Sequence, residues 1–319
     1  MAALAARIDR DLVRQWMPVV TLVILALIIG TVTPQFLTVD SLLVLAADTA
    51  TLFILATGVT FVIMLGGIDL SIQSMASLSS VLIALSVARL GYGSILLAVA
   101  AGALSGFLGG LAHVKLRIPS FIATLAVGGV LAGTALVISG ARSITLGEAE
   151  RGYLSWVSGY TLGIPHEVYI GVLVLLLAHV VQSRTRFGRY SAAIGAGEAA
   201  AYASGVKVDR TKVLALTLSG ALAAFAGVIL AGRLSSGSPT LANELLLPAI
   251  AAVVVGGTAI TGGIGSIWRT AIGALIISVV RIGMTFVGVD IFAQQIVFGA
   301  VLILAVAITI DRSKIPIVK

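Results

Sequence analysis

The sequence predicts an all-α membrane protein with about ten transmembrane helices, and three observations carry this prediction. Of its 319 residues, 59% are hydrophobic and only 10% are charged, whereas a soluble domain has roughly 25% charged residues. The apolar residues form long continuous runs, not the alternating pattern of barrel strands. Lysine and arginine gather in the short connections between these runs, as expected for loops that face the cytoplasm.

Ten apolar segments are candidates for membrane spans, because a bilayer core of about 30 Å needs roughly 20 helical residues. They cover residues 17–33, 42–65, 71–88, 94–112, 119–139, 168–182, 213–232, 245–260, 270–288 and 291–310. We expect the chain, 1–319, to form a single transmembrane domain with glycine-broken segments. Segments 71–88 and 245–260 are candidates for broken or re-entrant helices.

The basic residues orient these segments. With the N-terminus in the cytoplasm, most Lys and Arg are cytoplasmic, and only Arg89, Arg142, Arg151 and Arg233 lie outside. This bias predicts cytoplasmic N- and C-termini, with 1–16 as a cytoplasmic segment. The first apolar run has no small-residue cleavage box after it, so we expect a transmembrane helix and not a cleavable signal.

Two of the predicted connections are long. The outer one, 140–167, carries aromatic residues that suit a helix at the membrane surface. The inner one, 183–212, is basic, and its alanine-rich centre predicts a short amphipathic helix on the cytoplasmic face.

Several kinds of site are excluded by the sequence. There is no cysteine, so a disulfide, a zinc–thiolate site and a thiol nucleophile are ruled out. No Lys follows a Gly, so the Walker A phosphate loop is absent. His113, His166 and His179 lack metal-ligand spacing, and there is no G-x-S-x-G elbow. We predict no catalytic residue, no metal site, no cofactor bound by this chain and no nucleic-acid partner.

Residues 66–71 are the most informative stretch. Gly66 and Gly67 interrupt an apolar run, and Asp69 follows at the junction. A carboxylate in the membrane needs a partner or water, and broken helices are where transporters build polar sites. One interpretation is that Asp69 fixes the break or lines a substrate path; the other is that it caps the next helix.

A second glycine-rich break follows at 256–258 and 262–266. Close packing through small residues is the favoured interpretation there. Residues 62–67 resemble 253–257, which suggests duplicated halves. Asp48 and Arg281 are ionisable residues near or within spans, and a functional and a structural role are both open for each. We expect Asp48 near the outer interface, and Arg281 either to snorkel to the membrane surface or to pair with a carboxylate.

Five stretches, in order, resemble the permeases of ribose/xylose/arabinose-type sugar ABC importers. Residues 60–71 look like the hallmark of that family, and 118–125 are similar to the segment that opens its middle helix. Residues 185–190 and 193–206 resemble its cytoplasmic coupling loop, and 249–258 resemble its late glycine motif. The resemblance covers roughly residues 40–310.

The resemblance implies a multi-pass permease of the bacterial inner membrane that translocates a sugar, and a monosaccharide is the sugar class we expect. Its implied partners are a second permease copy or paralogue, an ATP-binding subunit that uses the ATP, a periplasmic substrate-binding protein and membrane lipid. The candidate residues for the substrate path or a structural break are Gly66, Gly67, Asp69, Ser71, Thr124, Gly256, Gly257 and Thr258. The candidate ATPase-coupling residues are Gly195, Glu198, Ala199, Ala200 and Gly205, with the two glycines bracketing a short helix.

The chain departs from the family pattern at three points, which leaves the substrate open. Residues 72–74 are Ile-Gln-Ser instead of Val-Gly-Ser, residues 195–197 are Gly-Ala-Gly instead of Gly-Gly-Asn, and Pro248 replaces an acidic residue. The alternatives are a nucleoside, a polyol or a branched-chain amino acid. A more distant alternative is an ion-coupled secondary transporter, although paired mid-helix charges are few.

Overall fold

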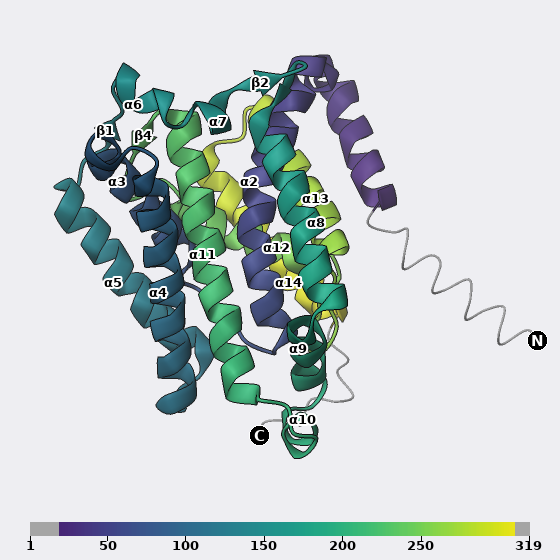
Figure 1. Ribbon diagram of the computed structural model, residues 1–319. Coiled ribbons are helices and arrows are strands. Elements are labelled where there is room, and N and C mark those ends of the chain that lie inside the picture. The colour runs from purple at the N-terminus through teal and green to yellow at the C-terminus, as the bar shows by residue number, and fades with distance from the viewer. Residues whose placement is uncertain (1–18, 310–319) are drawn as a thin grey trace, which may run out of the picture.

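The computed structural model describes residues 19–309, and over that range the protein is a bundle of apolar helices (Figure 1). The predicted segment 1–16 and the C-terminus lie outside the described residues. An apolar helix, Val19–Val32, comes first. The other principal helices are α2 (Val39–Met64), α3 (Ile72–Leu90), α4 (Gly93–Lys115), α5 (Ser120–Ser139), α8 (His166–Arg184), α11 (Val208–Leu234), α12 (Leu246–Val255), α13 (Ile267–Phe286) and α14 (Ile291–Thr309).

The predicted all-α membrane fold is confirmed. Among the described residues, seven helices are long and apolar enough to cross a membrane, and Val19–Val32, Asn243–Val255 and Phe292–Leu304 are shorter apolar helices. The segment predicted at 245–260 is shorter than expected, because its helix ends at Val255, directly before the paired glycines. In contrast, α11 begins at Val208, inside the predicted inner loop, because charged residues at the start of a helix do not prevent it from forming.

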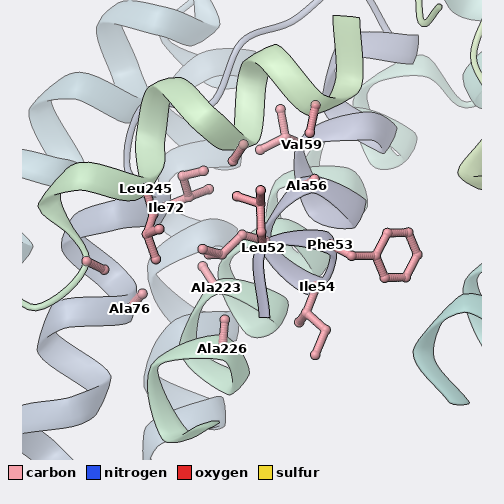
Figure 2. Close-up of a cluster of buried hydrophobic side chains, with 14 of the residues drawn as sticks. Leu52, Phe53, Ile54, Ala56, Val59, Ile72, Ala76, Ala223, Ala226 and Leu245 are labelled. Atoms are coloured by element: carbon pink, nitrogen blue, oxygen red, sulfur yellow. The ribbon is translucent and has the colours of Figure 1, made fainter. Parts of the chain in front are cut away.

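Helix α2 lies at the centre of the bundle (Figure 1) and contacts α8, α11, α12 and α13. Its side chains are buried without interruption from Thr49 to Met64. A helix that is apolar on every side is expected to be surrounded by other helices. Figure 2 shows part of the resulting core, where Leu52 and Val59 of α2 meet Ile72 of α3 and Ala223 of α11.

Small residues let two helices approach closely beside this core. An added Cβ at Gly106 of α4 would lie 2.0 Å from the Leu216 carbonyl oxygen of α11, and one at Gly220 would lie 2.2 Å from the Gly102 carbonyl oxygen. In a membrane, such close backbone contact is a main source of helix association. The α4–α11 pair is therefore a tightly packed part of the fold.

Short elements lie at the two ends of the bundle (Figure 1). One end, called the sheet end here, carries the pairs β1–β4 and β2–β3 with α6 (Glu148–Gly152) and α7 (Ser155–Ser158). The strands are β1 (Ile144–Thr145), β2 (Tyr160–Thr161), β3 (Ile164–Pro165) and β4 (Ser236–Gly237). The other end carries α9 (Arg186–Ala196) and α10 (Glu198–Ala203). Two 3-10 helices complete the description, η1 (Pro34–Leu37) and η2 (Asn243–Leu245).

Candidate functional site

The first break, residues 65–71, starts with a left-handed glycine turn. Gly66 has φ +78°, its N–H donates to the Ile63 carbonyl at 2.8 Å, and the Gly67 N–H donates to the Val62 carbonyl at 3.1 Å. These are the two hydrogen bonds of a Schellman motif, which satisfies the last carbonyls of a helix. The predicted interruption of the apolar run at Gly66 and Gly67 is therefore a helix end in a defined conformation.

Asp69 closes a turn directly before the helix that follows the break. Its Oδ1 accepts hydrogen bonds from the Ser71 N–H at 2.9 Å and from the Ser71 hydroxyl at 2.6 Å, just before α3 begins. The Asp69 side chain is only 1% exposed, and its Oδ2 has no hydrogen-bond partner among the described residues. Asp69 therefore fixes the turn between the first break and α3, whose N-cap residue Ser71 makes no side-chain capping hydrogen bond.

Helix α5 holds the first break from the side. The Ile68 N–H donates to Ser120 Oγ at 3.0 Å, and the Leu70 N–H donates to Thr124 Oγ1 at 3.0 Å. The Thr124 hydroxyl in turn donates to the Ile68 carbonyl at 3.3 Å. Thr124 was a predicted site residue, and its two hydrogen bonds hold the backbone of residues 68–70 against α5. Ser120 was not among the predicted site residues, although a hydroxyl one turn before Thr124 marks the same helix face.

The second break, residues 256–266, repeats the turn of the first. Gly257 has φ +87°, its N–H donates to the Val254 carbonyl at 2.8 Å, and the Thr258 N–H donates to the Val253 carbonyl at 3.1 Å. Gly257 thus occupies the place of Gly66, and Thr258 that of Gly67. The short sequence echo corresponds to the same Schellman turn in both places.

The two breaks touch each other and α9. The Gly263 N–H donates to the Met64 carbonyl at 2.9 Å, which joins the end of α2 to the second break. A Cβ added at Gly195 of α9 would lie 2.0 Å from the Met64 oxygen and 2.2 Å from the Gly263 nitrogen. Three stretches that were predicted separately, at 66–71, 256–266 and 195–205, therefore meet at one point.

The α9–α10 segment differs in detail from the predicted single helix. Gly195 lies inside α9 and does not bracket a helix, because Gly197 separates α9 from α10. Gly205, with φ +79°, follows the end of α10 as expected. The chain changes direction at Gly197, which has an extended conformation between the two helices.

One face of α10 is open and the other is attached to the bundle. Ala199 and Ala200 are exposed, whereas Ala201 is buried. Glu198 accepts a hydrogen bond from Lys212 Nζ at 2.7 Å, which links α10 to α11. A cavity of about 380 Å³ lies beside this ion pair and is lined by Gly66, Gly67, Ser120, Glu198 and Lys212 among others. Glu198, one of the predicted coupling residues, thus lines the same cavity as the first break.

Gln182 completes the junction and was missed by the sequence analysis. Its side-chain amide donates to the Gly265 carbonyl at 2.9 Å and accepts from the Ile267 N–H at 3.0 Å. It thereby holds the second break against the end of α8. The sequence feature that could have pointed to Gln182 is an amide residue at the C-terminal end of an apolar run.

The charged residues noted near the spans form a separate cluster. Asp48 of α2 pairs with Arg233 of α11 at 3.4 Å and with Arg281 of α13. The structure therefore gives Arg281 the carboxylate partner that was one of its two interpretations. Within the described residues there is no group of three or more His, Cys, Asp or Glu side chains that could hold a metal ion.

Comparison with known proteins gives a consistent result. Residues 41–306 match the family model described as branched-chain amino acid transport system / permease component. The ribose import permease protein of Bacillus subtilis (strain 168) is 41% identical over 300 residues, 93% of this chain and 92% of the relative. That of Escherichia coli (strain K12) is 37% identical over 294 residues, 91% of each chain. The L-arabinose transport system permease protein of Escherichia coli (strain K12) is 34% identical over 266 residues, 81% of this chain and 78% of the relative.

The family match spans both breaks, the α9–α10 segment and nearly all of the described helices, and the relatives cover most of the chain at well over 30% identity. The chain is therefore a membrane permease that belongs to the family of branched-chain amino acid transport system permease components, within which it is similar to sugar import permeases.

Proposed function

We propose that this chain is the permease subunit of an ATP-driven ABC importer in the bacterial inner membrane, and that it translocates a monosaccharide. The observation that carries the proposal is the 37–41% identity to ribose import permease proteins of two distant bacteria over more than nine-tenths of the chain. ATP is hydrolysed by a separate subunit in the cytoplasm, and the sugar is delivered by a periplasmic binding protein. A second permease copy or paralogue completes the transporter.

The arrangement at the α9–α10 end supports a way of coupling ATP hydrolysis to transport. The ATPase docks on the open face of α10 at Ala199 and Ala200, where small side chains allow close contact. A displacement of α9 reaches both breaks at once, because Gly195 leaves no free space against Met64 or Gly263. Each break is a helix end that can alter its angle without breaking a continuous helix. Binding and hydrolysis of ATP thus select between two arrangements of the membrane domain.

We propose ten membrane crossings with both termini in the cytoplasm. Seven long and three shorter apolar helices are available for these crossings. The predicted outer loop 140–167 and the β4 segment lie together at the sheet end, opposite α9 and α10 (Figure 1). The basic residues of the predicted inner loop accompany α9 and α10. Hydrophobic length therefore supports the number of crossings, and the position of the loops and their basic residues supports the orientation.

A branched-chain amino acid is the second candidate substrate, because the family description names that class. A nucleoside or a polyol would use the same architecture. An ion-coupled secondary transporter is disfavoured, because the relatives include proteins named as ABC transporter permeases and as import permeases.

The test is uptake by the complete transporter in reconstituted vesicles. We expect accumulation of D-ribose, D-xylose or L-arabinose that requires both ATP and the binding protein, with no accumulation of L-leucine. Leucine uptake without sugar uptake would assign the chain to amino-acid transport. Sugar uptake that persists without ATP and follows an ion gradient would overturn the ABC mechanism.

A further inference from the structure

A second polar region lies far from the α9–α10 end. A cavity of about 360 Å³, called the outer pocket here, is formed near the sheet-end termini of α11 and α13 and the start of α14. Its walls combine two aromatic rings, Phe286 and Phe298, with a polar set from five elements. That polar set comprises Asp48, Arg233, Glu244, Arg281, Gln294 and Gln295.

The charges of the outer pocket balance within its own walls. Its two arginines both pair with Asp48, and Glu244 is the fourth ionisable residue of the lining. Two cations against two carboxylates leave no net charge to attract an ion. The outer pocket is therefore suited to a neutral solute.

Hydrogen-bonding groups are nevertheless abundant. Gln295 Nε2 donates to the backbone carbonyl and to the carboxylate of Glu244. Gln294 Nε2 donates to Thr285 Oγ1 at 3.1 Å. Arg281 Nε is buried and has no hydrogen-bond partner among the described residues. Planar amide, carboxylate and guanidinium groups beside aromatic rings offer what a sugar requires, because hydroxyl groups both donate and accept while the ring C–H groups are apolar.

A smaller cavity lies beside the outer pocket, next to residues of the sheet end. It has a volume of about 170 Å³ and is lined by Ser158, Tyr160 and Glu167 from the β2–β3 region. It shares Val44 and Arg233 with the outer pocket, so Arg233 stands between the two cavities. In the proposed topology the β2–β3 region faces the periplasm. The two cavities therefore form consecutive polar spaces that lead inwards from that side.

We propose that the outer pocket is a transient binding site for a neutral monosaccharide, reached past Arg233 from the periplasmic side. This proposal rests on the proposed function and adds the location of a solute site within the chain. The size supports a small ligand, because small-molecule sites usually have volumes of about 300–1,000 Å³ and this one lies at the lower end. Asp48 holds Arg233 and Arg281 in place, which makes it a positioning residue for the site.

The absence of cysteine makes a direct test possible, because a single introduced cysteine is the only thiol of this chain, whose labelling is read on the separated subunit. We would introduce Gln295→Cys, and separately Thr285→Cys, into the complete transporter in right-side-out vesicles. A membrane-impermeant methanethiosulfonate reagent should label both cysteines, and the sugar that the wild-type chain imports should slow labelling several-fold. Labelling should also abolish uptake. The control is Leu173→Cys on the exposed apolar face of α8, where neither labelling nor a sugar effect is expected.

The outcomes separate this proposal from the proposed function. If the wild-type transporter imports none of D-ribose, D-xylose and L-arabinose, the sugar assignment fails, and with it the sugar site. If it imports one of them, but that sugar leaves the labelling rate of both cysteines unchanged and the labelled proteins transport normally, the outer pocket proposal fails alone. Failure of the reagent to reach either cysteine overturns it as well.

Discussion

Gly195 determines how closely the α9–α10 segment approaches the membrane domain. An added Cβ at this position would lie within 2.2 Å of two backbone atoms, Met64 O and Gly263 N, and neither can rotate away as a side chain would. The sequence marks Gly195 as a candidate coupling residue only through its resemblance to a family loop. Its physical role becomes visible only when the two breaks are placed beside it.

Gly195→Ala is therefore expected to be destabilising. Overpacking of this kind costs about 1–3 kcal/mol, more than the roughly 1 kcal/mol that alanine gains over glycine in a helix. We expect a lower melting temperature of the purified protein and reduced uptake. Gly129→Ala in α5 is the matched control, because nothing lies within 4 Å of its added Cβ. Equal behaviour of the two variants would contradict the close contact.

Asp69 is expected to act mainly through its hydrogen bonds to Ser71. Asp69→Asn keeps a side-chain oxygen for the Ser71 N–H, whereas Asp69→Ala removes it and should cost about 1 kcal/mol. Thermal unfolding of the two purified variants should therefore place Asn near the wild type and Ala below it. If Asp69→Asn instead loses uptake at unchanged stability, the charge belongs to the transport path and not to the turn before α3.

At the scale of the elements, apolar length predicts the helices well and glycine predicts their ends. Each of the ten predicted segments overlaps an apolar helix among the described residues, because a long apolar run in lipid satisfies its backbone polar groups within itself only as a helix. The end of α12 was misplaced by five residues, since the left-handed turn at Gly257 stops the helix at Val255. The contact between the two breaks could not be predicted, because about 200 residues separate Met64 from Gly263 and no local periodicity records their pairing.

Gln182 joins α8 to the second break, and its replacement should loosen that contact. Gln182→Met keeps the side-chain length and removes hydrogen bonds to the half-buried Gly265 carbonyl and to the N–H of the buried Ile267. An unsatisfied buried group costs about 1–3 kcal/mol. We expect a lower melting temperature and slower uptake, whereas Ser183→Ala, which loses only a bond within α8, should be near neutral. Parity between Gln182→Met and Ser183→Ala would show that the junction does not depend on this amide.

At the scale of the whole molecule, the orientation in the membrane follows from charge and can be checked by thiol accessibility. Leu162 is 92% exposed between β2 and β3, and Tyr202 is 75% exposed on α10. With the chain expressed alone in intact cells, an impermeant maleimide should label Leu162→Cys directly. Tyr202→Cys should be labelled only after the membrane is permeabilised. The reverse pattern would invert the proposed topology.

In the proposed importer, α9 and α10 carry the signal of ATP hydrolysis to both breaks. The decisive assay is binding-protein-stimulated ATP hydrolysis by the reconstituted transporter carrying Ala199→Arg, with Ala199→Ser as the control that keeps a small side chain on the same exposed face. We expect Ala199→Arg to insert normally but to lose stimulation, uptake and co-purification with the ATPase, while Ala199→Ser retains all three. If Ala199→Arg keeps full stimulation and still co-purifies with the ATPase, α10 is not the docking element and does not couple ATP hydrolysis to transport.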